Sequence, residues 1–485
     1  MSNEPQREAA PLAGQRVECG TDSETGELTV KTQAAIDELA GCEILRAGLV
    51  IEFSDPALDL QPLETLRVIE GQLRVAAPWS FERVPVRLRS LHGLEGLRSV
   101  ASLTVSGVES GLGPLSQLSG DVTELILEDL PGVRDLSVLG GLRVTRLFSL
   151  DLMPDLERLG PVALAPQLES VSISTAPQLT SLAGLEGLVE LRSLDLRDVG
   201  LRELALPDSL VSLPYVSISG ASELTSLAEL SRRPGVLGLR VGSNPRLTDL
   251  GGNGSSDSSL QQLAVYACPS LTEIHPVGGF SALTNVEITD CDGITQIDRI
   301  AESSALQMLQ IRGNAALTRL PVFERAPAQM VQIRIADNAA LVQGPSFPNL
   351  TRLYYFETPY YESAELELSN NPLLAAIGEY PQLESLTMLA LNQQPALTSL
   401  TLPSLRSLGW LRVRDNASLT RVELAVREGL SIIEVAGNPK LEVLSLGPAS
   451  GLLQRLQLQE NPALAGEDRQ RLLDRINELT EATLD

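Results

Sequence analysis

The feature that most constrains the fold is a segment of 22–24 residues that repeats along most of the chain. Each copy has the form apolar-x-apolar-x-x-Asn/Cys-x-x-Leu-x-x-Leu, as in LRVGSNPRLTDL (239–250), AVYACPSLTEI (264–274) and LQIRGNAALTRL (309–320). One such copy cannot bury its apolar side chains alone, so a fixed period of this length is typical of stacked solenoids. About 18 copies are present, and they predict one continuous core.

Within each copy, apolar residues at alternate positions predict a short strand with one buried face. Strands of successive copies would then form one parallel sheet. The segments that return to the next strand are short and contain Pro and Gly, as in GNP, ENP and CPS, which leaves little room for helices.

A single position in the repeat is polar through the second half of the chain. Its occupants are Asn244, Cys268, Cys291, Asn314, Asn338, Asn371, Gln394, Asn416, Asn438 and Asn461. Earlier copies carry apolar residues there: Val108, Leu130, Met153, Ala176, Val199 and Ala221. We interpret the polar series as an asparagine ladder, stacked inside the solenoid, in which cysteine substitutes twice.

These repeats resemble the leucine-rich repeat family over roughly residues 28–464. The opening AAIDELAGCEILRAGLVI and LETLRVIEGQLRV resembles receptor L-domains, and LTSLAGLEGLVELRSLDLRD (179–198) resembles bacterial internalin-like repeats. The resemblance implies an α/β leucine-rich repeat solenoid, mostly parallel β. It would be a curved, right-handed, single-sheet coil with short helical or irregular convex returns and a small C-terminal capping helix.

This organisation divides the chain into four expected parts. Residues 1–18 would be a disordered leader or the rest of a removed signal region, and 19–48 an N-terminal cap. Residues 49–465 would be the solenoid, with an L-domain-like start (49–105) and an insertion (345–365). Residues 466–485 would form a capping helix, because Leu472, Leu473, Ile476 and Leu479 have helical spacing. The L-domain resemblance also implies a disulfide between Cys19 and Cys42.

The other two cysteines allow two interpretations. Cys268 and Cys291 occupy the ladder position of consecutive copies, so their Cα atoms would lie ~5 Å apart, within the range for a disulfide. The favoured interpretation is that both pack reduced, as small buried groups. With His275 they would offer only three zinc ligands, and His275 is expected on another side. The sequence therefore predicts no metal and no other cofactor.

Charge and motifs exclude several classes of function. The formal net charge is −25, which argues against a nucleic-acid or anionic-membrane partner. No apolar run reaches the ~18–20 residues that span a bilayer. Signatures of nucleophilic, metallo- or nucleotide-dependent enzymes are missing, so we expect no enzyme. A carbohydrate-active solenoid enzyme is the remaining catalytic alternative, because 62 acidic residues could supply a carboxylate pair.

Two surfaces are candidates for binding a protein or glycan ligand. The first is the concave sheet face, where Arg, Trp and Tyr would be exposed: Tyr215, Arg240, Tyr266, Arg312, Arg334, Trp410, Arg412 and Arg414. Other positions expected to be exposed there include Glu287, Glu367, Asn392, Glu434 and Gln457. The second is the aromatic insertion with Tyr354, Tyr355, Tyr360 and Tyr361.

Each surface also has a structural interpretation. The arginines could form cross-strand pairs with glutamates, and the tyrosines could fill the core of an irregular repeat. The resemblance favours a non-catalytic bacterial surface or secreted binding scaffold, located outside the cell or in the cell envelope. An adhesion element without a discrete ligand is the alternative.

Overall fold

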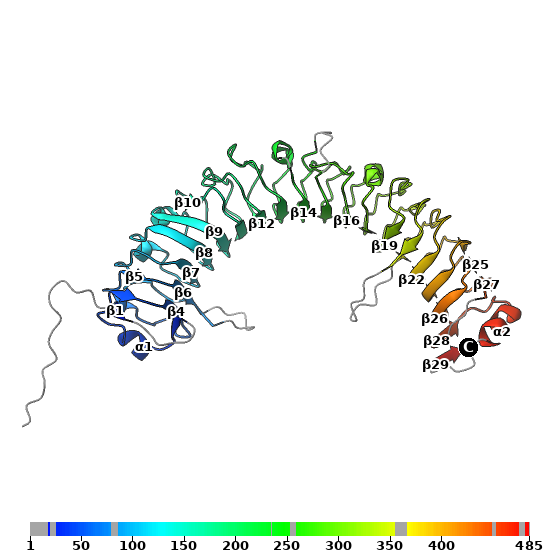
Figure 1. Ribbon diagram of the computed structural model, residues 1–485, viewed down its shortest axis with the longest axis horizontal. Helices are drawn as coiled ribbons and strands as arrows, with labels where there is room; N and C mark the ends of the chain where they lie inside the picture. Colours follow the sequence, from blue (N-terminus) through cyan, green and yellow to red (C-terminus); the bar gives the residue numbers. More distant parts are fainter. Residues whose placement is uncertain are drawn as a thin grey trace, which may run out of the picture. The chain divides into compact units, whose positions relative to one another are not determined.

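The computed structural model describes residues 18–19, 26–78, 86–233, 235–252, 259–354, 366–448, 453–474 and 481–484. They belong to two compact units, Met1–Gly200 with Ala205–Val211 and Leu201–Leu204 with Ser212–Asp485. Within each unit, strands from successive repeats pair in parallel (Figure 1). The predicted fold is confirmed: the chain forms a parallel β-solenoid of about 18 turns with little helix.

The first unit contains one main sheet and a small second one. The main strands are β2 (Glu27–Val30), β4 (Gly48–Glu52), β6 (Gln72–Ala76), β7 (Ser102–Ser106), β8 (Gly120–Glu128), β9 (Leu142–Asp151), β10 (Ala163–Leu164), β11 (Ser170–Ala176) and β12 (Ser193–Val199). The small sheet pairs β1 (Glu18–Cys19), β3 (Ile44–Leu45) and β5 (Val68–Ile69). The helices are α1 (Gln33–Asp37), η1 (Gln61–Leu63), η2 (Gly113–Leu115) and η3 (Ser137–Leu139).

The second unit repeats this plan. Its main strands are β13 (Tyr215–Ser219), β14 (Gly238–Gly242), β15 (Gln262–Tyr266), β16 (Asn285–Thr289), β17 (Met308–Arg312), β18 (Gln329–Met330), β19 (Gln332–Ala336), β20 (Arg352–Leu353), β21 (Leu366–Ser369), β22 (Ser385–Asn392), β24 (Ser407–Arg414), β26 (Glu428–Ala436), β28 (Arg455–Gln459) and β29 (Glu481–Leu484). A side sheet pairs β23 (Ser399–Leu402), β25 (Arg421–Leu424) and β27 (Val443–Ser445). The helices are η4 (Ala228–Arg232), η5 (Asp298–Glu302) and α2 (Gly466–Asp474). None of the described helices has the length and apolar character needed to cross a membrane.

One repeat shows how the sequence builds the core. On β15, Leu263 and Val265 point inward and are at most 2% exposed, while Gln262, Ala264 and Tyr266 point outward. The return segment then buries further side chains of the same repeat: Cys268, Leu271, Ile274, Val277, Phe280 and Leu283. Stacked on their counterparts in neighbouring repeats, these side chains form the aliphatic core that the repeat predicts.

The ladder position is buried, and its asparagines link consecutive repeats. Asn314 donates from its backbone N and its Nδ2 to Asn338 Oδ1, at 3.1 and 3.2 Å. Asn338 Nδ2 donates in turn to Ile311 O, Ala336 O and Asn371 Oδ1, at 3.1, 2.8 and 3.1 Å. Each amide thus satisfies backbone groups at the turn and passes one hydrogen bond to the next repeat.

The residue before the ladder position has a left-handed backbone that the sequence pattern did not reveal. Its φ lies between 49° and 58° at Asp129, Leu152, Thr175, Asp198, Ser243, Ala267, Asp290, Asp337, Asn370, Gln393, Asp415 and Glu460. Glycines with positive φ fill the same position at Gly107, Gly220, Gly313 and Gly437. This conformation turns the chain from the strand into the core. It favours Gly, Asn and Asp over branched or bulky residues.

Leucine at position 152 is therefore expected to destabilise the first unit. It has φ 52° and its side chain is 42% exposed, so it suffers backbone strain without being buried. We expect Leu152→Asn to raise the free energy of unfolding of the first unit by about 0.5–1 kcal/mol. Urea denaturation would measure this. The matched control is Val189→Asn, an exposed apolar residue that has no positive φ. An equal gain in the stability of the control would show that the effect comes from removing exposed apolar surface and not from relieving backbone strain.

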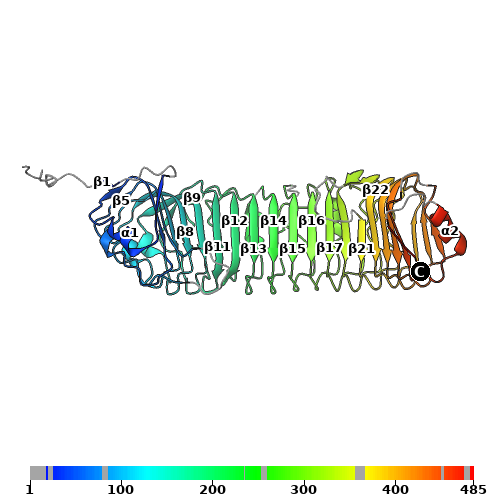
Figure 2. The ribbon, with the colours of Figure 1, turned by 90° about the horizontal axis from the view of Figure 1, so that it is seen from below.

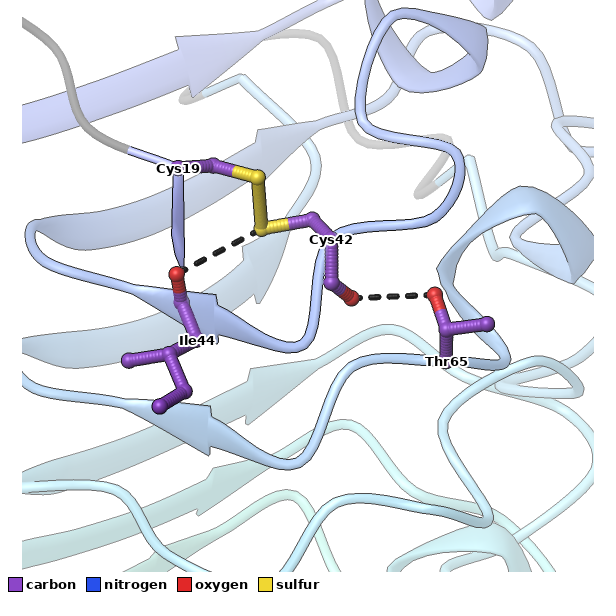
Figure 3. The surroundings of a disulfide bond; sticks show 4 residues. All are labelled: Cys19, Cys42, Ile44 and Thr65. Atoms are coloured by element: carbon purple, nitrogen blue, oxygen red, sulfur yellow. Dashed lines mark hydrogen bonds between the residues drawn. A yellow bond between two sulfur atoms is a disulfide. The ribbon is translucent and has the colours of Figure 1, made fainter. Parts of the chain in front are cut away.

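A disulfide joins Cys19, at the end of β1, to Cys42, two residues before β3 (Figure 3). Cys19 and Cys42 have Cα atoms 5.9 Å apart, as the L-domain resemblance implies for this pair. Cys42 Sγ also lies 3.5 Å from Ile44 O, and Thr65 Oγ1 donates to Cys42 O at 2.9 Å. The bond ties β1 beside β3, where it closes the start of the small sheet.

The C-terminal segment is less helical than its leucine spacing predicts. Helix α2 covers only Gly466–Asp474, and strand β29 (Glu481–Leu484) pairs in parallel with β28. Asp468, in the first turn of α2, accepts a hydrogen bond from Leu444 N at 3.1 Å, which fastens the helix to β27. The difference from the expected helix over 466–485 arises because β28 offers an unpaired edge, which a short strand satisfies.

Candidate ligand-binding face

The candidate site lies on the outward side chains of the main-sheet strands from β13 to β28, without the side-sheet strands β23, β25 and β27. We call this surface the sheet face, and Figure 2 shows the ribbon of its strands. From β13 to β19, parallel pairing without a register shift brings equivalent residues into rows across the strands. One row contains Ser217, Arg240, Ala264, Glu287, Gln310 and Arg334. The structure therefore places the residues proposed from sequence on one surface of the second unit, but it gives them different surroundings.

Two of the candidate arginines are engaged with acidic neighbours. Arg334 Nε donates to Glu367 Oε2 on the adjacent strand at 2.7 Å, and Arg312 Nε donates to Asp337 Oδ2 at 2.8 Å. Both arginine side chains are partly exposed to solvent, so each pair contributes little to stability, about 0–1 kcal/mol. Their charge is neutralised locally, and the structural interpretation of these two residues is the better supported one.

Trp410, Arg412 and Arg414 belong to a self-contained cluster around a buried carboxylate. Arg412 Nε and Arg414 donate to the same oxygen of Glu434, at 2.8 and 3.1 Å, and Arg455 lies 3.6 Å from the other oxygen. Glu434 was expected to be exposed, and this expectation is wrong, because its side chain is only 4% exposed. Arginines on the two flanking strands, β24 and β28, cover it.

Further contacts make this cluster compact. The guanidinium of Arg412 lies over the Trp410 ring, with Cζ 4.6 Å from the ring centroid. Trp410 also packs against Met388 and Ala390, which are only 3% and 2% exposed although they lie on the outward side of β22. In the described part of the chain, Trp410 Nε1 and Arg414 Nε are buried without a hydrogen-bond partner. The cluster thus resembles a small second core more than an open binding surface.

Tyr215, Arg240 and Tyr266 have different surroundings, centred on strand β14. Tyr215 leans over Gly238 from β13, and Tyr266 lies over Gly242 from β15. Arg240 sits between the two glycines, with its Cζ 5.2 Å from the centroid of the Tyr266 ring. Tyr215 is 49% exposed. With Gln262, which reaches back toward Gly238, these residues form what we call the tyrosine platform.

Arg240 differs from most arginines of this face. The described arginines on the main-sheet strands of the second unit are Arg240, Arg312, Arg334, Arg352, Arg412, Arg414 and Arg455. Among the described residues, Arg240 and Arg352 have no carboxylate within 4 Å, whereas the other five do. The repeat pattern predicts that Tyr215, Arg240 and Tyr266 are exposed, but it gives no role to Gly238 and Gly242. The signal in the sequence is glycine at both ends of one strand, which often marks a place where another group lies close to the backbone.

The aromatic insertion contributes little that can be described. Tyr354 is half-buried, and its backbone N donates to Met330 O at 3.1 Å. Tyr355, Tyr360 and Tyr361 lie outside the described residues. Phe347, near the start of the insertion, stacks on Phe323 in the core with ring centroids 4.4 Å apart.

The thiols of Cys268 and Cys291 are free and fully buried. They donate to Tyr266 O and Thr289 O, at 3.4 and 3.3 Å. The neighbouring Cys268 thiol raises the pKa of Cys291, and burial raises it further, so this thiol stays protonated. Across the described residues, no group of three or more His, Cys, Asp or Glu side chains is arranged to hold a metal ion.

Comparison with known proteins gives matches among solved structures alone. No protein-family model matches the chain, and no curated protein matches its sequence. An internalin from Listeria monocytogenes is 18% identical, with 60% of this chain and 82% of that one covered and a TM-score of 0.35. A leucine-rich repeat protein from Leptospira interrogans is 13% identical, with 94% and 100% covered and a TM-score of 0.33.

A third similar structure is the ectodomain of a plant membrane receptor kinase from Arabidopsis thaliana, determined in complex with Casparian strip integrity factor 2. It is 18% identical, with 90% of this chain and 72% of that one covered and a TM-score of 0.25. Because the TM-scores are low, the assignment of the fold depends on the molecule itself: the repeat length, the parallel sheet and the buried asparagine ladder. On these observations, the chain has the fold of a leucine-rich repeat solenoid.

Proposed function

We propose that the chain is a non-catalytic binding scaffold that recognises a protein or glycan ligand through the sheet face of its second unit. The observation that carries this proposal is the tyrosine platform, where two aromatic rings flank an arginine that has no acidic partner in the described part of the chain. Tyr and Arg are the residue types that dominate binding energy at recognition surfaces. Solenoids commonly bind ligands on such extended faces.

The proposed location is outside a bacterial cell or in its envelope. The disulfide between Cys19 and Cys42 supports it, because such bonds persist mainly in oxidising compartments. The strongly acidic surface, with 62 acidic against 37 basic residues, favours a soluble recognition module over a binder of nucleic acid or anionic lipid.

The test uses the full chain on an array of purified extracellular proteins and glycans. We expect at least one array member to bind, and Tyr215→Ala/Tyr266→Ala to weaken that binding about tenfold or more. Leu373→Ala is the matched control, since Leu373 is 53% exposed but lies on a return segment. Absence of any bound array member, or equal binding by both variants, would contradict the proposal. It would favour the adhesion element without a discrete ligand.

A further inference from the structure

We infer that the ligand of the tyrosine platform is an acidic oligosaccharide that runs along strand β14 and carries a carboxylate opposite Arg240. This inference rests on the proposed function and specifies the class of ligand. It follows from the spacing of the rings, the charge between them and the chemistry of the surrounding side chains.

The two glycines of β14 are needed for space, not for backbone conformation. Neither Gly238 nor Gly242 has a positive φ. A Cβ at Gly242 would overlap Cζ and both Cε atoms of Tyr266, so the face of that ring covers the glycine. A Cβ at Gly238 would lie 2.8 Å from Cδ1 of Tyr215. Glycine weakens a strand. Its presence at both ends of β14, on the outward side, therefore indicates that making room for the Tyr215 and Tyr266 rings has a function.

The separation of the two rings sets the size of the ligand. Gly238 and Gly242 are four residues apart on one strand, which corresponds to about 13 Å. That distance is longer than a single sugar ring. A ligand that contacts both Tyr215 and Tyr266 must therefore be an extended chain of several sugar units lying along β14.

Charge between the rings sets the chemistry of the ligand. Arg240 is exposed, contacts the Tyr266 ring and has no carboxylate partner among the described residues. A guanidinium held against an aromatic ring presents its planar donors to one group at a time, and a carboxylate accepts them in a bidentate manner. Arg240, with no described carboxylate within 4 Å, is complementary to one anionic group placed opposite it, and this attraction is local because the net charge of −25 supplies none.

The neighbouring outward residues favour a sugar over a protein surface. Around the platform, Ser217, Ser219, Gln262 and Asn285 present hydroxyl and amide groups, and Ala264 and Glu287 lie in the same row as Arg240, one and two strands away. The core of a typical protein interface is apolar and tightly packed. Short hydroxyls and amides instead match the many hydroxyl groups of a saccharide, while the ring of Tyr215 offers an apolar surface to its C–H groups.

The experiment measures binding of defined hexasaccharides to the full chain by titration calorimetry. The probes are oligogalacturonate, oligoalginate and hyaluronan, with neutral maltohexaose and hexaglutamate peptide as comparisons. We expect at least one acidic hexasaccharide to bind and the two comparison probes to bind at least tenfold more weakly. Arg240→Gln should weaken the binding about tenfold, and Arg240→Lys should weaken it less, because lysine keeps the charge but loses the bidentate geometry.

Two further variants make the result specific. Gly242→Ala should weaken binding by displacing the Tyr266 ring, although Arg240 is retained. Arg325→Gln, an exposed arginine on a return segment, should leave binding unchanged. The inference is overturned if no acidic hexasaccharide binds, if maltohexaose or hexaglutamate binds equally well, or if Arg240→Gln has no effect. Capture of an arrayed protein through Tyr215 and Tyr266 would overturn this inference and leave the proposed function standing.

Discussion

Replacing Asn338 by alanine is expected to lower the free energy of unfolding of the second unit by about 3–5 kcal/mol. The side chain is fully buried and takes part in five hydrogen bonds with the turn and the two neighbouring repeats. Alanine would leave the buried backbone N of Asn314 without its acceptor and would remove the donor that serves Ile311 O and Ala336 O, although Asn314 Nδ2 keeps its bonds to two other carbonyl oxygens. Each buried donor left unpaired costs about 1–3 kcal/mol.

Urea denaturation followed by circular dichroism would measure this loss. Asn349→Ala is the matched control, because Asn349 is exposed and makes one hydrogen bond, to Glu324 O at 2.8 Å. We expect the control to change stability by less than about 0.5 kcal/mol. Losses of similar size in both variants would show that the ladder hydrogen bonds contribute no more than those of an ordinary surface amide.

Replacing Glu434 by alanine is expected to cost a similar amount, about 3–5 kcal/mol, for an electrostatic reason. The carboxylate lies between Arg412, Arg414 and Arg455, and its removal takes away the negative charge that these three guanidinium groups share. Arg412 and Arg414 are themselves partly buried, so solvent screens their repulsion poorly. Removing one partner from a buried pair is far more costly than removing an exposed pair.

The matched control is Glu423→Ala. Glu423 is 40% exposed and pairs with Arg421 at 2.7 Å, so its loss should cost less than about 1 kcal/mol. Raising the salt concentration should reduce the small effect at Glu423 and leave most of the effect at Glu434. If Glu434→Ala proves as mild as the control, the arginine cluster is stabilised mainly by packing on Trp410.

The repeat explains why so much of the fold could be predicted from the sequence. Spacing alone locates the strands, the buried leucines and the ladder position, because each repeat experiences the same surroundings. The ion pairs could not be predicted in the same way. Whether Arg334 meets Glu367, or Arg240 meets no acid, depends on which side chains occupy neighbouring strands at the same row. That information appears only when the register across the insertion is known.

Two other features escaped prediction for identifiable physical reasons. The left-handed residue before the ladder position is Asp, Asn or Gly in most repeats, but Leu152 and Thr175 hide the pattern. Glycine at 238 and 242 was assigned no meaning, because its effect is to admit a ring from the neighbouring strand. The alternation of residues along a strand predicts which face a side chain occupies, but it does not predict whether neighbouring side chains cover it. Glu434 was therefore expected to be exposed, although its neighbours bury it.

The two ladder thiols give the second unit a mechanical weak point. From Asn314 to Asn461, amide oxygens accept hydrogen bonds from the preceding repeat, whereas Cys268 and Cys291 offer only weakly bonding sulfur. In a linear array held together by nearest-neighbour contacts, separation begins where the coupling between neighbours is smallest. Under tension or in denaturant, the stack should first part at these two turns, and the asparagine-linked repeats beyond them should remain together as one cooperative block.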